Sequence, residues 1–166
     1  MNAVTIRTAG AADRGAIRSL VAEAFGGDAE AALVDRLVAD GDVVLELVAE
    51  RDGAILGHLL FSRLEVAEAG QAFPAVALAP LAVAAASRRS GVGAELVEAA
   101  HRHLSDAGEA LSVVLGDPTY YGRFGYRHAP ASGFTSDYQC EALQALAWRE
   151  APTQGRLVYA PAFSAL

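Results

Sequence analysis

Residues 78–104, LAPLAVAAASRRSGVGAELVEAAHRHL, contain the pattern on which the predicted fold rests. The apolar run of residues 75–83 is long enough for a buried strand, and residues 84–90 make a short turn that carries two arginines. From residue 91 to residue 104, apolar side chains recur at helical spacing, so that one face is apolar and the other polar. The stretch therefore predicts a strand, a glycine-rich turn and a helix, in that order.

The turn and the start of the predicted helix make a candidate phosphate site. The first N–H groups of a helix have no intrahelical partner, and the helix dipole is positive there. Gly91 and Gly93 lack a Cβ, so a ligand can approach the backbone closely, and Arg88 and Arg89 add positive charge. Together these features suit a phosphate or pyrophosphate. The alternative is a turn whose glycines serve packing alone.

Two common phosphate-binding motifs do not fit this turn. The dinucleotide fingerprint requires a third glycine, but the sequence has Leu96 at that position. A P-loop requires Gly-Lys followed by Ser or Thr, and the turn contains no lysine. What remains is the spacing Arg88-x-x-Gly91-x-Gly93 after an apolar strand.

Composition predicts a single domain over residues 1–166 that is not a nucleic-acid-binding protein. Hydrophobic residues make up 53% of the chain, which is ample for a core, and the net charge is −7, which disfavours a polyanionic partner. The single cysteine allows no internal disulfide and no cysteine-based zinc site. The N-terminus has no apolar signal segment, and no run is long enough to span a membrane. We therefore expect a cytoplasmic protein without a membrane segment or a bound metal.

The other elements follow from periodicity and turn residues. Asp-Gly between two apolar runs, at residues 51–53, is a strong hairpin signal. Asp13 and Asp28 stand where they can cap two early helices, and Asp117-Pro118 where it can start a short helix. Residues 140–149 fit either a helix or a strand. The predicted strands are 4–8, 43–50, 54–66, a strand ending at 83, 111–115 (parallel to the preceding one), 126–129 and 157–159, and the early helices lie within 16–25 and 29–40.

The glycine-rich turn resembles the coenzyme A pyrophosphate loop of the GNAT superfamily of N-acetyltransferases, whose pattern is Gln/Arg-x-x-Gly-x-Gly/Ala. The segment YGRFGY, residues 121–126, is similar to the Tyr-x-x-x-Gly-Phe/Tyr segment of that family. The segments 78–83, 114–121 and 158–163 resemble, in the same order, a bacterial subfamily of predicted N-acetyltransferases with LGDPxYYxRFGF and YxPAF segments. The resemblance covers nearly the whole chain.

The resemblance implies an α+β GNAT fold. Its central sheet is mixed but mostly antiparallel, has helices on both faces, and is splayed near Val83 so that the pantetheine arm of acetyl-CoA can enter between strands. It also implies acetyl-CoA as cosubstrate. The residues that it assigns to coenzyme binding are Leu81, Ala82, Val83, Arg88, Arg89, Ser90, Gly91, Val92, Gly93, Ala94 and Tyr121.

The implied reaction is acetyl transfer from acetyl-CoA to a primary amine of a small molecule or peptide, by direct attack in a ternary complex. Tyr121 is then the proposed general acid near the coenzyme sulfur. Some relatives place a basic glutamate on the strand before the loop, but residues 73–83 contain no acid. Glu65 is the base that we assign. Other candidates for the base are Glu46, Asp117 and His58, each through a water molecule if needed.

The missing acid leaves a second reading open, in which the chain is a non-catalytic acyl-CoA-binding or regulatory module. For the enzyme, the expected partners are acetyl-CoA and an amine acceptor, with no nucleic acid and no membrane. We expect a monomer or a homodimer.

Overall fold

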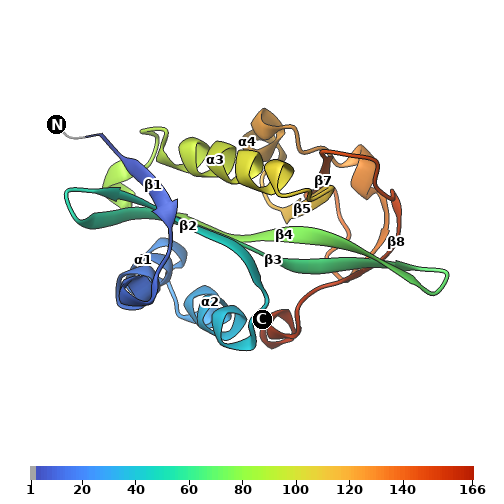
Figure 1. Cartoon of the computed structure of the whole chain (residues 1–166), viewed down its shortest axis with the longest axis horizontal. Coiled ribbons are helices and arrows are strands. Elements are labelled where there is room, and N and C mark those ends of the chain that lie inside the picture. The colour runs from blue at the N-terminus through green and yellow to red at the C-terminus, as the bar shows by residue number, and fades with distance from the viewer. Residues whose placement is uncertain (1–2) are drawn as a thin grey trace.

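The computed structural model describes residues 3–166, and these residues form one mixed sheet with helices on both faces (Figure 1). The sheet has eight strands in the order β1-β2-β3-β4-β5-β7, and β8 pairs with both β3 and β6. The strands are β1 (Thr5–Thr8), β2 (Val43–Arg51), β3 (Ala54–Glu68), β4 (Gln71–Val83), β5 (Leu111–Leu115), β6 (Gly133–Thr135), β7 (Leu143–Ala147) and β8 (Gln154–Val158). The α+β class and the mostly antiparallel sheet expected from the sequence are therefore confirmed.

Two layers of helices cover the sheet. In Figure 1, α1 (Arg14–Phe25) and α2 (Ala29–Asp40) lie below the sheet, while α3 (Val92–Asp106) and α4 (Pro118–Tyr121) lie above it. The C-terminal 3-10 helix, Pro161–Ala165, lies beside α2 on the lower side. Each long helix turns its buried stripe toward the sheet, for example Leu96, Val97 and Ala100 of α3. Among residues 3–166, no helix has both the length and the hydrophobicity needed to cross a bilayer.

Strands β4 and β5 separate early, as the family resemblance implied. Their parallel pairing joins Val76 to Ser112 and continues only as far as Leu78 and Val114. Strand β4 then runs on to Val83 with β3 on one side, where Leu81 pairs with Leu59. Within residues 3–166, no strand pairs with the other edge of β4 beyond Leu78. This part of β4 therefore offers free backbone groups at the splayed end of the sheet.

Some local predictions were wrong. Residues 126–129 make no strand, because Arg127 forms only an isolated bridge with Ala145 before the chain turns into a 3-10 helix at Ala129. Asp13 does not cap α1 with its side chain, since its carboxylate accepts hydrogen bonds from Arg7 and from the Gly10 N–H instead. The Asp28 side chain makes no capping bond to α2 either. The undecided segment 140–149 contains strand β7, which pairs with β5.

Gly57 of β3 sets how closely α3 packs on the sheet. A Cβ at this position would lie 2.8 Å from Leu96 Cδ1 and 2.9 Å from Val92 Cγ1. Because both contacts are with the buried face of α3, a side chain at residue 57 forces Leu96, Val92 or the helix itself to shift, and the first turn of this helix borders the splayed part of β4.

We therefore expect Gly57→Ala to lower the free energy of unfolding by about 1–3 kcal/mol, the usual cost of overpacking a core. The measurement is urea denaturation followed by circular dichroism. Gly15→Ala is the matched control, because Gly15 is exposed near the start of α1, and no atom of the described residues would lie within 4 Å of a Cβ there. It should be neutral or stabilising by up to about 1 kcal/mol. Equal stability of the Gly57→Ala variant and the native protein would contradict this account of the packing.

Candidate functional site

A pocket of about 530 Å³ lies at the start of α3, beside the free edge of β4. Arg88, Arg89 and Arg123 all line it, and among residues 3–166 no acidic side chain does. Three guanidinium groups around a helix start make a strongly anion-attracting site, since arginine also binds phosphate oxygens in a bidentate manner. The full lining is Leu81, Val83, Ser87, Arg88, Arg89, Gly91, Gly93, Ala94, Tyr120 and Arg123.

The backbone of the loop suits an anion as well. Arg89 has φ 63° and Gly91 has φ 89°, so two residues in three adopt the left-handed conformation. Such turns direct backbone N–H groups into a concave anion-binding nest. Gly91 is the N-cap of α3, which leaves the N–H groups of Val92, Gly93 and Ala94 without intrahelical acceptors. A non-glycine residue in the left-handed conformation is uncommon, and such residues occur in tight turns and at functional sites.

The structure brings most of the assigned coenzyme residues together. Seven of them line the pocket: Leu81, Val83, Arg88, Arg89, Gly91, Gly93 and Ala94. Three others do not line it with their side chains. Ala82 and Val92 are buried in the core, and the Ser90 hydroxyl donates to the Ser87 carbonyl within the turn. Any contact of Ala82 or Val92 with a ligand therefore has to come from the backbone.

The two adjacent tyrosines have different places. Tyr120 lines the pocket, and a Cβ on Gly93 would lie 2.6 Å from its hydroxyl oxygen. Tyr121 is not in the lining but packs on the core near the splay, where a Cβ on Gly116 would lie 2.5 Å from its Cε2. Burial raises the pKa of Tyr121 to about 12, so this hydroxyl stays protonated at physiological pH.

The sequence left open which of Tyr120 and Tyr121 faces the cleft, and we assigned Tyr121; Arg123 was missed. The Arg123 guanidinium lies over the Tyr120 ring, 5.5 Å from its centroid, and over the Phe124 ring at 5.6 Å. These cation–π contacts hold the charge beside the pocket. Residues three apart in a helical turn lie on the same side. The spacing of Tyr120 and Arg123 in the segment that follows Asp117 could therefore have revealed the pair.

Glu65, the residue assigned as general base, lies away from this pocket. It is exposed on β3, opposite Pro74 of β4 and Val158 of β8. The pocket borders β4 at Leu81, seven residues further along the strand than Pro74. At about 3.3 Å per residue, Glu65 and the part of the pocket at Leu81 are roughly 20 Å apart along the sheet. The structure therefore places Glu65 far from the coenzyme pocket along the sheet.

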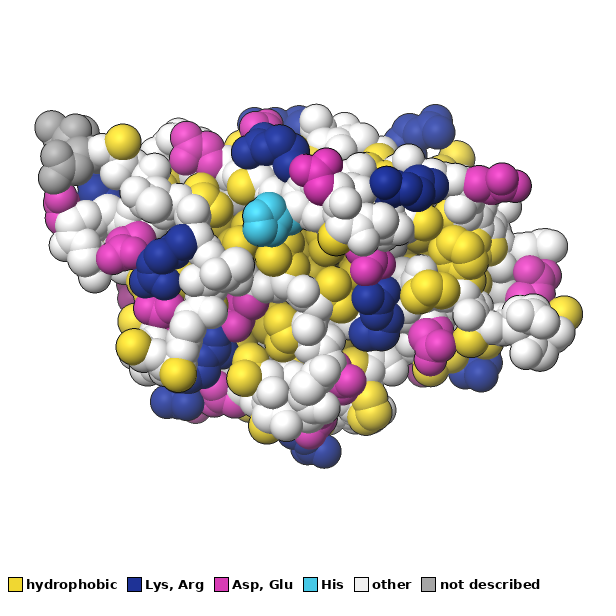
Figure 2. Space-filling view, viewed as in Figure 1, with side chains coloured by type: hydrophobic (Ala, Val, Ile, Leu, Met, Phe, Trp, Pro, Cys, Tyr) yellow, Lys and Arg dark blue, Asp and Glu magenta, His cyan; other side chains and the backbone are white. Residues whose placement is uncertain are grey.

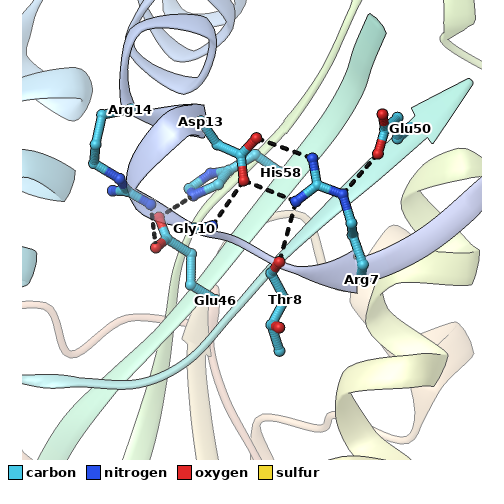
Figure 3. A network of polar contacts seen from close by, with 8 residues as sticks. All are labelled: Arg7, Thr8, Gly10, Asp13, Arg14, Glu46, Glu50 and His58. Atoms are coloured by element: carbon cyan, nitrogen blue, oxygen red, sulfur yellow. Dashed lines mark hydrogen bonds and ion pairs between the residues drawn. The ribbon is translucent and has the colours of Figure 1, made fainter. Parts of the chain in front are cut away.

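Glu46 and His58 belong to a buried polar network between β2, β3 and α1 (Figure 3). Glu46 accepts from Arg14 Nη2 at 2.5 Å, and its other oxygen lies 2.7 Å from His58 Nε2. Burial raises the pKa of Glu46, but the hydrogen bonds with His58 and Arg14 outweigh it, so the pKa lies below its usual value. His58 has an exposed fraction of 0%. Both groups are thus held by the fold, and no acceptor amine can touch His58 directly.

Arg7 extends the network to the surface. It binds Asp13 in a bidentate manner at 2.8 and 2.9 Å and Glu50 at 2.6 Å, which ties the start of α1 to β1 and β2 (Figure 3). The hydrogen bonds from Arg7 and from the Gly10 N–H hold the pKa of Asp13 well below its usual range. This carboxylate is therefore a structural anchor.

The last candidate base, Asp117, caps α4. Its carboxylate accepts the Thr119 N–H at 2.9 Å, which confirms the predicted helix start. In the described part of the chain, no group of three or more His, Cys, Asp or Glu side chains is arranged to hold a metal ion. The candidate bases named from the sequence therefore form no acid–base pair at the coenzyme pocket within residues 3–166.

Residues 5–129 match the family model described as an acetyltransferase (GNAT) domain. The uncharacterized N-acetyltransferase YhbS of Escherichia coli (strain K12) is 40% identical over 118 residues, which cover 70% of each chain. The uncharacterized N-acetyltransferase YjhQ of the same strain is 33% identical over 139 residues, which cover 82% of this chain and 77% of YjhQ.

Two crystal structures extend the similarity over nearly the whole chain. YhbS from Escherichia coli in complex with CoA has a TM-score of 0.89 at 32% identity and covers 97% of this chain and 92% of its own. A GNAT family acetyltransferase from Brucella melitensis in complex with acetyl-CoA has a TM-score of 0.83 at 32% identity, with 97% and 98% coverage.

Proposed function

The chain belongs to the GNAT acetyltransferase family, and from this premise we propose that it transfers an acetyl group from acetyl-CoA to a primary amine by direct attack in a ternary complex. The observation that carries the proposal is the pocket at the start of α3. It combines three arginines, a left-handed loop and the free edge of β4. The complexes of two related proteins with CoA and acetyl-CoA support the same ligand here.

The coenzyme binds along β4 and α3 in this proposal. Its pyrophosphate accepts hydrogen bonds from the N–H groups at the start of α3, and Arg88, Arg89 and Arg123 neutralise its phosphates. Its pantetheine arm pairs with the free backbone edge of Leu81 and Val83 in the manner of an added strand. Holding the thioester in this way supplies the entropic part of catalysis.

The chemical step needs an oxyanion donor and a partner for the leaving thiolate. A backbone N–H near Leu81 is the donor for the developing oxyanion. A thiol has a pKa near 8.5, well below that of Tyr121, so full proton transfer from the tyrosine is uphill. Tyr121 therefore acts by hydrogen-bonding the departing sulfur. Glu65 is not retained as the base, because it lies at the other end of the strand.

Calorimetry with acetyl-CoA, followed by thiol release across a panel of amines with the same preparation, tests the proposal. Binding together with amine-dependent thiol release is the expected result. Binding without release from any amine would favour a non-catalytic acyl-CoA-binding module, which the missing acid on β4 makes the second candidate. Absence of acetyl-CoA binding would overturn both readings.

A further inference from the structure

Strand β1 forms one edge of the sheet and leaves part of its backbone unpaired. In the described part of the chain, β1 pairs with β2 on one side and with no strand on the other. Just after β1, the Ala9 N–H donates to the Glu46 carbonyl at 3.0 Å. Because hydrogen bonding alternates along an antiparallel strand, the backbone groups of Val4, Ile6 and Thr8 point to the open side. Such an edge is a template for pairing with another strand.

The polar network of Figure 3 holds this edge in place. Arg7 binds Asp13 at the start of α1 and Glu50 of β2, so β1 is fixed to both. A strand that is already ordered loses little conformational freedom when it pairs. The Thr8 carbonyl also accepts from Arg7 Nη1 at 3.2 Å, so the groups without a partner are centred on Ile6.

A groove of about 600 Å³ runs beside this edge, between β1 and α3. Its floor is apolar and includes Val4 and Ile6 of β1, Leu47 of β2 and Ala99 of α3. Charged side chains of α3 form one wall. Figure 2 shows this side of the molecule, where acidic and basic side chains and a histidine surround hydrophobic ones. The groove therefore joins the open edge of β1 to a charged helix face.

The charges on this face of α3 have an order. Glu95 and Glu98 lie in the N-terminal half of the groove wall, and Arg102 and His103 lie in the C-terminal half. All four side chains are exposed, and among residues 3–166 none of them forms an ion pair or a side-chain hydrogen bond. Ala99 stands between the two halves. A helix face of this kind is complementary in charge to an antiparallel copy of itself.

We propose that two copies of the chain form a dimer through β1, about a two-fold axis that is normal to the sheet and passes beside Ile6. The axis meets the groove at its middle, where Ile6 and Ala99 both line it. Ile6 pairs with the partner's Ile6, and the Thr8 N–H donates to the partner's Val4 carbonyl. These contacts give about four backbone hydrogen bonds and join the two sheets edge to edge.

The same axis places the two α3 helices opposite each other. They run antiparallel roughly 20 Å apart, because each lies over β2 and β3 and neighbouring strands are about 4.8 Å apart. Extended side chains cross this distance, so Arg102 meets the partner's Glu98 and His103 meets the partner's Glu95. Asp106 lies toward the positive start of the partner's α3. The open edge and the charge order therefore fit a single symmetry axis.

Sedimentation equilibrium of the native chain is the first test. We expect twice the mass of the chain at about 100 μM protein. A monomer at that concentration would leave the edge to a strand of another protein and overturn the proposal.

Thr8→Pro should raise the Kd of the dimer by at least about tenfold, because proline removes an N–H on the open side of β1 that pairing with β2 does not need. Thr8→Ala keeps this N–H and should stay within about threefold of the native Kd. Thermal unfolding checks that both variants fold. A native Kd in the folded Thr8→Pro variant would contradict pairing through β1.

The last test uses the symmetry. Glu98→Arg places an arginine opposite the partner's Arg102, and Arg102→Glu places a glutamate opposite the partner's Glu98. Each repulsion occurs twice in the dimer, so each variant alone should dimerise at least about tenfold more weakly. In an equal mixture, all these contacts join opposite charges, and a heterodimer should form within about threefold of the native Kd.

Glu23→Arg is the matched charge control, since Glu23 is exposed on α1, which covers the other face of the sheet. It should leave the Kd of the dimer unchanged. A mixture of the Glu98→Arg and Arg102→Glu variants that associates no better than either variant alone would contradict the antiparallel arrangement of the α3 helices. A dimer that neither the β1 nor the α3 variants weaken would place the interface elsewhere and overturn the proposal.

Discussion

Gly91→Glu is expected to weaken acetyl-CoA binding by at least about 100-fold, measured by calorimetry. The carboxylate would stand at the N-cap of α3, among the N–H groups and arginines proposed to hold the pyrophosphate, and would repel it. Residue 91 also has φ 89°, so any side chain there adds backbone strain. The expected loss thus combines a charge effect with a change in the loop.

Gly108→Glu separates these two causes. Gly108 has φ 92°, and as at Gly91 no atom within residues 3–166 would lie within 4 Å of a Cβ there. Gly108 lies just beyond the C-terminal end of α3. It should carry the same strain without a change in acetyl-CoA affinity. Thermal unfolding of both variants checks that the strain is matched. An affinity of the Gly91→Glu variant within about threefold of the native value would refute the assignment of the loop.

Tyr121→Phe should lower kcat by about 10- to 100-fold and leave KM for acetyl-CoA nearly unchanged. The substitution removes only the hydroxyl, so the ring still packs against Gly116 and Tyr126. Since the pKa of Tyr121 is raised to about 12, the tyrosine stays protonated through the usual assay range. The native kcat should therefore show no decline up to about pH 10 from ionisation of this group.

Tyr120→Phe is the matched control for this prediction. Tyr120 lines the coenzyme pocket beside Gly93, so loss of its hydroxyl should act mainly on KM for acetyl-CoA. Steady-state kinetics of the two variants side by side gives the comparison. If the Tyr120 variant alone loses kcat, the hydrogen bond to the departing sulfur belongs to Tyr120 and not to Tyr121.

Local signals were sufficient for the central part of the fold. The strand, turn and helix around residues 78–104 could be predicted because apolar spacing and paired glycines act over a few residues. The Asp52-Gly53 turn was equally clear, since both residues adopt positive φ, as a tight hairpin turn requires. The order of elements around the coenzyme pocket can therefore be predicted from short stretches of sequence.

The features that the sequence did not predict depend on contacts between residues far apart along the chain. Residues 140–149 carry no decisive period, and only pairing with β5 selects a strand for part of them. From the sequence, we expected Glu65 to be an available acid on a hairpin strand. Strand β8, more than 80 residues further along the chain, pairs with the edge of β3 that contains Glu65. Tyr138, Tyr159 and Phe163 line one pocket of about 150 Å³, but they come from separate segments near the C-terminus, so no local motif predicts that they meet.

Strand β3 also shapes the order in which the protein can fold. One edge of this strand pairs with β4. The other edge pairs with β2 up to Ser62 and with β8 from Glu65 to Ala67. During synthesis the hairpin partners of β3 are available long before residues 154–158 leave the ribosome. Until then the far end of that edge has unpaired backbone groups, which invite pairing with another chain. Glu65, exposed on this very segment, places a charge where such aggregation would start.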